Sequence, residues 1–203
     1  MKYDILIIGG GAAGLQCALV LGSAIKQPYA ADKKIGIIIH QKASHLNSAL
    51  LNNVLGIPPG TEGGVILESG KKQLSDLYPH VDQIENEKVL NISGTEGNFT
   101  ITSNKRNYQA VEIVIATGYA KPFGIKGLEN LEIPHRRSVA EKDRIELKNS
   151  DHLSAPGLWV AGTLAGWRSQ FAIAAGSGAQ VATDILTKWN NGKHAKVHDK
   201  IAE

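Results

Sequence analysis

The feature that most constrains this chain is a glycine-rich turn directly after its first apolar run. Residues 4–8 are apolar and β-branched, which is typical of a buried parallel strand. The sequence then breaks into Gly9-Gly10-Gly11-Ala12-Ala13-Gly14, and the Ala- and Leu-rich residues 15–25 that follow predict a helix. The pattern G-x-G-x-x-G between a strand and a helix is typical of a dinucleotide-binding turn. We therefore expect a Rossmann-like unit at the start of the chain.

Each glycine of this turn has its own physical role. Gly9 permits the tight turn, Gly11 lets a pyrophosphate approach the backbone, and Gly14 lets the helix lie close to the strand. Ala12 and Ala13 belong to the same turn and should border the ligand. The N–H groups of the helix start, and the positive end of its dipole, would then face the phosphates.

Composition indicates a globular chain without a nucleic-acid footprint. We expect a single domain over residues 1–203, because this length can bury one good core. The net charge of +3 is spread rather than clustered, which argues against nucleic-acid binding. The sequence has one cysteine, Cys17, so it can form neither an internal disulfide nor a CxxC pair. No metal-ligand cluster stands out.

The N-terminal apolar stretch can be mistaken for a secretion signal. The strand–turn–helix interpretation explains Asp4, the three glycines and Gln16, whereas a signal peptide explains none of them. No stretch reaches a membrane-spanning length without polar interruption. We therefore expect a cytoplasmic protein with no membrane partner.

The second predicted strand, residues 35–39, lacks the acidic residue that usually ends it. In dinucleotide folds that acid bonds a ribose hydroxyl, about twenty residues past the glycines. Here the strand ends in His40-Gln41, and either side chain could hydrogen-bond a ribose. A neutral or cationic end also tolerates a phosphate, so this position leaves open which adenine dinucleotide binds.

The remaining pattern predicts an α/β fold, with a parallel sheet, helices on one face and a three-strand antiparallel meander on the other. A helix over 64–78 would use Val65, Leu67, Leu74 and Leu77 as its apolar positions. Loops are expected over 44–60 and 119–153, the latter with one or two short strands, and the tail from residue 190 should fray. The other expected elements are buried strands over 81–84, 112–116 and 157–161, meander strands over 88–93, 98–103 and 107–111, and a last helix over 169–189.

Further motifs follow the glycine turn in chain order. One strand ends in Ala116-Thr117-Gly118, a later strand ends in Gly162-Thr163, and Gln170-Phe171-Ala172 opens the last predicted helix. In this order the motifs resemble the FAD domain of thioredoxin-reductase-like flavoproteins, which are pyridine nucleotide-disulfide oxidoreductases. The resemblance covers nearly the whole chain. It implies that the first of these segments passes the cofactor, the second meets the ribityl chain and the third meets the flavin ring. We also expect Val81 to bind the cofactor.

The departures from this family are equally informative. Its members carry an NADPH domain between the A-T-G motif and the late strand, but here thirty-nine residues lie between Gly118 and Leu158. The sequence has no second G-x-G-x-x-G and no redox CxxC. Thr163 stands where the family has an aspartate, so the ribityl contact would lack charge.

We therefore interpret the chain as a minimal FAD-dependent oxidoreductase, reduced by free NAD(P)H or by a protein electron donor. An FAD-binding subunit without activity of its own and a plain NAD-binding Rossmann protein are the alternatives. A flavin face without an NADPH domain needs other cover, for which the loop 45–53, Trp167 or a second copy in a homodimer is available. His135, His194 and His198 are expected to be surface residues. The residues that could border the ring are His45, Asn47, Ser48, Tyr119, Trp167 and Arg168.

Overall fold

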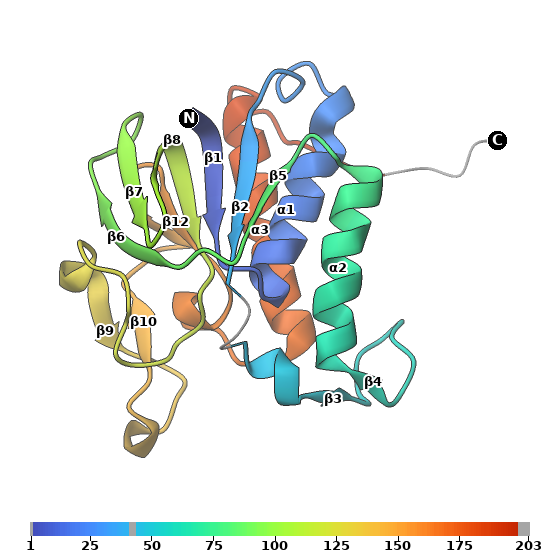
Figure 1. Cartoon of the computed structure of the whole chain (residues 1–203), viewed down its shortest axis with the longest axis vertical. Helices are drawn as coiled ribbons and strands as arrows, with labels where there is room; N and C mark the ends of the chain where they lie inside the picture. Colours follow the sequence, from blue (N-terminus) through green and yellow to red (C-terminus); the bar gives the residue numbers. More distant parts are fainter. Residues whose placement is uncertain (1, 41–43, 199–203) are drawn as a thin grey trace.

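The centre of the computed structural model is a mixed, mostly parallel sheet (Figure 1). The structure describes residues 2–40 and 44–198. The strand order is β11-β12-β8-β1-β2-β5, and β1 pairs in parallel with both β2 and β8. This arrangement confirms the predicted fold class. The strands on this path are β1 (Lys2–Ile8), β2 (Ile35–Ile39), β5 (Asp82–Glu85), β8 (Asn107–Ile115), β11 (Leu153–Ala155) and β12 (Leu158–Val160).

Strand β8 changes partner along one of its edges. Its first half pairs antiparallel with β7 (Phe99–Ser103), which pairs with β6 (Val89–Ser93), and this is the predicted meander. Its last residues pair in parallel with β12. The sequence predicted separate strands over 107–111 and 112–116, and that division is wrong. The other edge of β8 pairs with β1 from Gln109 to Ile115, which holds the backbone extended throughout.

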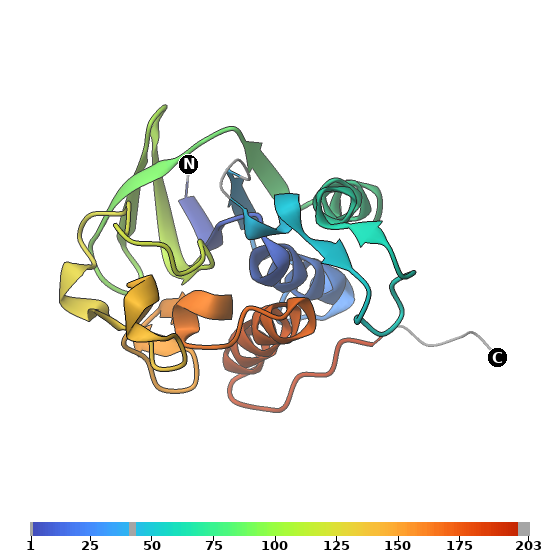
Figure 2. The ribbon, with the colours of Figure 1, turned by 90° about the horizontal axis from the view of Figure 1, so that it is seen from below.

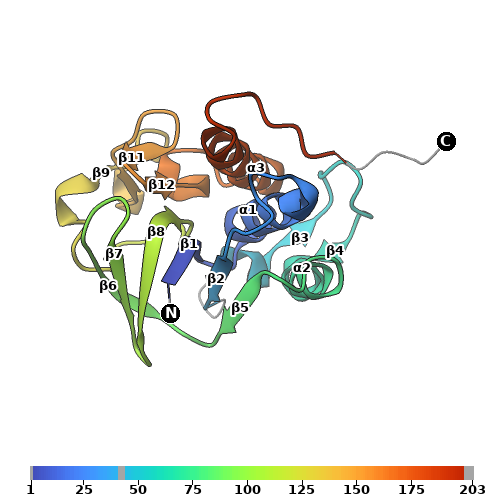
Figure 3. The ribbon, with the colours of Figure 1, turned by 90° about the horizontal axis from the view of Figure 1, so that it is seen from above.

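The helices α1 (Ala12–Ser23), α2 (Gly63–Leu77) and α3 (Phe171–Trp189) cover one face of the sheet, and β6 and β7 lie on the other side (Figure 3). Helix α1 lies between α2 and α3. Helix α2 buries Leu67 and Leu74. The expected apolar positions Val65 and Leu77 are instead exposed, at 56% and 59%, so the buried stripe of α2 is narrower than predicted.

The core has two layers, one on each face of the sheet. Successive residues of β1 alternate between them, with Ile5 and Ile7 on the helix side and Leu6 and Ile8 on the meander side. Burial on both faces is the reason that this strand is continuously apolar.

Small hairpins flank the carboxyl end of the sheet (Figure 1). One, β3–β4 (Leu50–Leu51 and Thr61–Glu62), and a 3₁₀ turn over His45–Ser48 lie in and beside the stretch predicted as loop. The other, β9–β10 (Glu132–Pro134 and Ile145–Leu147), confirms the short strands expected within 119–153.

The tail after α3 packs against the molecule in its described part. Ala195 is buried and Val197 contacts the helix-side core, so the expectation of a fraying tail is wrong there. Within residues 2–40 and 44–198, no helix has both the length and the apolar character needed to cross a membrane.

Candidate functional site

A cavity of about 570 Å³ lies beyond the carboxyl ends of the parallel strands. Because β1, β2, β8 and β12 run in the same direction, the segments that follow them meet at one edge of the sheet. Motifs far apart in the sequence therefore come together here. The predicted residues that line the cavity are Gly9, Gly11, Ala12, Ala13, His40, Ala116, Thr117, Gly118, Gly162, Thr163, Gln170 and Phe171.

The glycine turn is shaped partly by packing and partly by open space. Gly9 has φ +117°, and a Cβ there would lie 2.4 Å from the carbonyl oxygen of Ala116. A Cβ on Gly14 would lie 1.8 Å from the carbonyl oxygen of Gly9, so Gly14 serves helix packing and is not on the wall. At Gly11 no described atom beyond the local backbone lies within 4 Å of the Cβ position. The fold therefore requires Gly9 and Gly14, whereas Gly11 leaves room at the cavity.

Two helix N-termini face this cavity. Helix α1 begins after Gly11 and α3 begins after Gln170 (Figure 2). Their first turns, which the structure describes in full, carry no acidic side chain, and neither N-cap residue makes a side-chain cap. Free N–H groups and the positive ends of the dipoles therefore favour an anion here. Together with the space at Gly11, this arrangement fits the pyrophosphate of a dinucleotide.

Some predicted cofactor positions do not reach the cavity. Val81 precedes β5 and is buried beside Gly22 in the helix-side core, so placing it at the site is wrong. It lies at the amino end of a strand whose carboxyl end leads to the cavity, and Val89 lines the wall instead. Ala172 is exposed on α3 and is not part of the wall among the described residues. Gln41 lies outside the described residues.

Several wall residues were missed because their segments had no motif. They include Ser44, Lys88 and the stretch 122–125, whereas Leu46 and Asn53 belong to the loop 45–53 that the sequence offered as cover. The rule that a site lies after the carboxyl ends of parallel strands would have pointed to residues 87–89 after β5. The other segments are brought to the cavity by tertiary contacts, for which the sequence carries no local signal.

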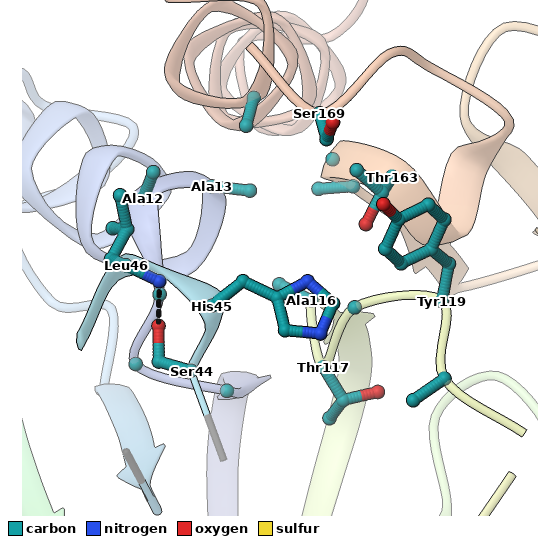
Figure 4. A pocket seen from close by; sticks show the side chains of 18 of the residues that line it. Ala12, Ala13, Ser44, His45, Leu46, Ala116, Thr117, Tyr119, Thr163 and Ser169 are labelled. Carbon is teal, nitrogen blue, oxygen red and sulfur yellow. Dashed lines mark hydrogen bonds between the residues drawn. The ribbon is translucent and has the colours of Figure 1, made fainter. Parts of the chain in front are cut away.

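His45 and Tyr119 approach each other across the cavity (Figure 4). Their ring centroids are 5.6 Å apart in an edge-on arrangement. The Arg144 guanidinium lies 4.9 Å from the centroid of the Tyr119 ring, and His135 meets the same ring edge-on at 5.4 Å. His45 and Tyr119 thus both line the cavity. Asn47, Ser48, Trp167 and Arg168 do not belong to its described wall.

Two histidines, His135 and His152, are buried and hydrogen-bonded, which the sequence did not predict. His135, expected at the surface, is 6% exposed, and its Nε2 lies 3.0 Å from the carbonyl oxygen of Thr163. His152 is 5% exposed and contacts Trp167, which therefore does not cover the cavity.

The buried carboxylate of Glu87 also borders the cavity. Among the described residues no group of three or more His, Cys, Asp or Glu side chains could hold a metal ion.

The fold and the position of this cavity are typical of Rossmann-type dinucleotide-binding proteins. The family profile of the pyridine nucleotide-disulphide oxidoreductases matches residues 3–178. The chain belongs to that family, whose thioredoxin-reductase-like members are FAD-binding oxidoreductases with NAD(P)H as reductant.

Similar proteins come from several bacteria. The chain is 31% identical over 130 residues to the thioredoxin reductase of Treponema pallidum, which is 62% of this chain and 38% of the relative. It is 31% identical over 139 residues to a ferredoxin–NADP reductase of Streptococcus thermophilus, which is 63% of this chain and 39% of the relative. The chain thus spans about two fifths of the length of these relatives.

Solved structures show the same fold at lower identity. A thioredoxin reductase from Gloeobacter violaceus superposes with a TM-score of 0.70 at 16% identity, covering 100% of this chain and 99% of that one. A ferredoxin-flavin thioredoxin reductase from Clostridium acetobutylicum gives 0.67 at 18% identity, covering 94% and 99%. At such identities the likeness concerns the fold.

Proposed function

We propose that this protein is an FAD-binding oxidoreductase of a minimal, single-domain type. The observation that carries the proposal is the meeting of four sequence motifs on one cavity of about 570 Å³. The glycine turn, Ala116–Gly118, Gly162–Thr163 and Gln170–Phe171 come from four separate segments, yet all line the same wall. A cavity of this size lies within the range of cofactor and ligand sites.

The residues of the chain suggest how FAD would be held. The N-terminus of α1 and the open space at Gly11 would take the pyrophosphate. Thr163 and the backbone around Gly162 would take the ribityl chain by hydrogen bonds without charge. The N-terminus of α3 would stabilise negative charge at the ring end. FAD, when bound, supplies hydride and single-electron chemistry.

We infer that the electron donor is a separate molecule. Thirty-nine residues between Gly118 and Leu158 are too few for a second nucleotide-binding unit. We propose free NAD(P)H or a protein electron donor as the reductant. Cys17 is wholly buried, and burial raises the pKa of its thiol, so we propose that the protein does not use a dithiol relay.

The alternative is an FAD-binding subunit whose partner chain completes the activity. The observation that favours it is the exposed apolar surface of the β3–β4 hairpin, where Leu50 in β3 is 60% exposed and Leu55 in the connecting loop is 101% exposed. Such residues beside a cofactor cavity suit a protein contact.

The test is to purify the protein, release the bound cofactor and identify it, and then add NADH or NADPH without oxygen. Released FAD whose colour is bleached by either nucleotide supports the proposed oxidoreductase. FAD that stays oxidised until a protein donor is added supports reduction by a protein donor. FAD that neither donor reduces supports the subunit. Release of NAD alone would contradict both proposals and favour a plain Rossmann protein.

A further inference from the structure

The loop between β12 and α3, residues 162–167, is held in place by a segment that follows the A-T-G motif. This loop carries Gly162 and Thr163 to the cavity wall and leads directly to Ser169 and Gln170. The holding segment, residues 135–152, lies where the resemblance places an NADPH domain in other family members. We call residues 135–152 the clamp.

The first contacts come from the arginine-rich start of the clamp. His135 Nε2–H donates to the carbonyl oxygen of Thr163 at 3.0 Å, because its Nδ1 already accepts from the backbone N–H of Arg137 at 3.1 Å. Arg137 Nη1 donates to the carbonyl oxygen of Gly166 at 2.5 Å. Its guanidinium also lies 4.8 Å from the ring centroid of Trp167, within the range of a cation–π contact.

The end of the clamp makes a second set of contacts. Asn149 Nδ2 donates to the carbonyl oxygens of Leu147 and Ala165. The His152 ring stacks on Trp167 with centroids 5.9 Å apart, so this indole lies against both Arg137 and His152.

A hydrogen-bonded chain connects His152 to the backbone at the cavity. Trp167 Nε1–H donates to His152 Nε2 at 2.9 Å, and indole N–H is only a donor, so this nitrogen carries no proton. The Ser177 hydroxyl lies 2.9 Å from the same nitrogen and can donate to it. Ser177 Oγ in turn accepts from the backbone N–H of Gly162 at 2.8 Å. The neutral form of His152 is therefore the form that accepts from Trp167 and holds the loop.

The surroundings of His152 favour this neutral form. Burial lowers the pKa of His152, and the carboxylates of Asp184 on α3 and Asp151 on the same loop oppose that effect. Arg137, on the other side of Trp167, adds a positive charge. Protonation would turn Nε2 into a donor facing the N–H of Trp167, and the hydrogen bond between His152 and Trp167 would break.

We propose that the clamp preorganises the FAD site, with Arg137 and His152 as positioning residues that do not touch the cofactor. This inference rests on the proposed function. A loop already fixed in its binding shape does not pay ordering entropy when the ligand arrives, so its affinity is higher. In this chain the clamp therefore supports the loop 162–167 from the position where the resemblance places an NADPH domain.

The test compares variants that remove a clamp contact with matched variants that do not. Arg137→Gln removes a contacting cation, and Lys142→Gln removes a cation of the same segment whose side chain bonds to no described residue. His152→Leu removes the acceptor, and His152→Gln replaces the imidazole with an amide oxygen that accepts but does not titrate. The FAD dissociation constant, followed by flavin fluorescence, should rise about tenfold in Arg137→Gln and His152→Leu at about pH 8. It should stay unchanged in Lys142→Gln and stay close to wild type in His152→Gln.

The pH dependence separates positioning from general stability. Wild-type affinity should stay constant down to the ordinary histidine value of 6.5 and fall below it, as His152 gains a proton at its lowered pKa. His152→Gln should show a weaker pH dependence than wild type. Equal pH profiles of the two proteins would overturn the assigned role of His152.

Hydrogen exchange on the protein without FAD gives a second readout. Amides of residues 162–167 should exchange faster in Arg137→Gln and His152→Leu than in Lys142→Gln, and the Gly162 amide should exchange faster in Ser177→Ala. Unchanged exchange there, with unchanged FAD affinity, would overturn the clamp. A wild-type chain that binds no FAD would overturn the proposed function and the cofactor role of the clamp, whereas the exchange data would still decide whether the clamp holds the loop.

Discussion

At the scale of single residues, Gly11 and Glu87 show how differently two residues on one cavity wall are used. Gly11 has open space at its Cβ position and an ordinary backbone conformation, with φ −82°. Glu87 is 2% exposed and is bonded on several sides. The open space at Gly11 suits a ligand, whereas Glu87 is fixed by contacts within the fold.

Gly11→Val should fold normally and lose FAD. Beyond the local backbone, no described atom lies within 4 Å of the Cβ position, so the valine side chain would occupy the space left for the pyrophosphate. The measurement is flavin content after purification, with Gly64→Val on α2 as the control, because its Cβ position is equally open. Full occupancy in Gly11→Val would refute the placement of the site.

Glu87 should contribute stability that is lost in acid. Burial alone would raise the pKa of this carboxyl, but hydrogen bonds from Ser103 and Tyr108 and the charges of Arg106 and Lys105 outweigh burial and lower it. The ionised form is therefore favoured by folding, and its contribution is complete above the ordinary value of 4.5 and is lost as pH falls through the lowered folded pKa.

Glu87→Gln should lower the free energy of unfolding by about 1–3 kcal/mol at neutral pH, because buried donors lose a charged acceptor. The difference from wild type should shrink in acid. Denaturant unfolding at several pH values measures it, with the exposed Glu141→Gln as the control. A difference that stays constant with pH would contradict the assignment.

At the scale of elements, α1 and α3 form a tight pair. A Cβ on Gly178 would lie 2.0 Å from the carbonyl oxygen of Ala13, whereas no described atom outside the local backbone of α3 lies within 4 Å of the Cβ position of Gly176. Of these two glycines, only Gly178 is required by close packing. Because Ala13 also lines the cavity, the same contact places the glycine turn beside the start of α3.

Gly178→Ala should destabilise the protein by about 1–3 kcal/mol, since the added methyl group forces α3 away from α1. Gly176→Ala should be stabilising by about 0.5–1 kcal/mol, since alanine is the better helix former. Thermal unfolding of the two variants gives the comparison. Equal shifts in the same direction would mean that the helices adjust freely, contrary to the packing described.

At the scale of the whole molecule, the cavity opens between elements from both ends of the chain and from its middle. The exposed side of α3 carries Ala172, Ile173 and Gly176, which leaves an apolar strip near the cavity. We propose a homodimer through this side of α3, with the cavity near the interface, because an uncovered ring would lose electrons to oxygen.

Light scattering at micromolar concentration should show a dimer, and Ile173→Glu should shift it to a monomer by burying an unpaired charge. Val65→Glu, on the exposed side of α2, is the matched control and should leave the mass unchanged. A monomeric wild-type protein, or a dimer that persists in Ile173→Glu, would contradict this proposal.

Much of the fold follows from local sequence. The runs of residues 4–8 and 35–39 are apolar because their strands are buried on both faces, and the glycines at 9 and 14 meet steric demands that only glycine satisfies. The sequence therefore predicted the sheet and the helices, whereas the expectation that the motifs meet one cofactor came from the family resemblance. Its expectation for α2 was less accurate, because Val65 and Leu77 face solvent and periodicity alone does not say which apolar residues find a partner.

Only the tertiary structure decided which other residues serve the site. Val89 rather than Val81 lines the cavity because strand direction determines which end of β5 faces it. His135 and His152 are buried and bonded to a loop 28 and 15 residues further along the chain. Such contacts depend on how distant segments fold back on one another, and isolated histidines in a sequence carry no sign of the partner they will meet.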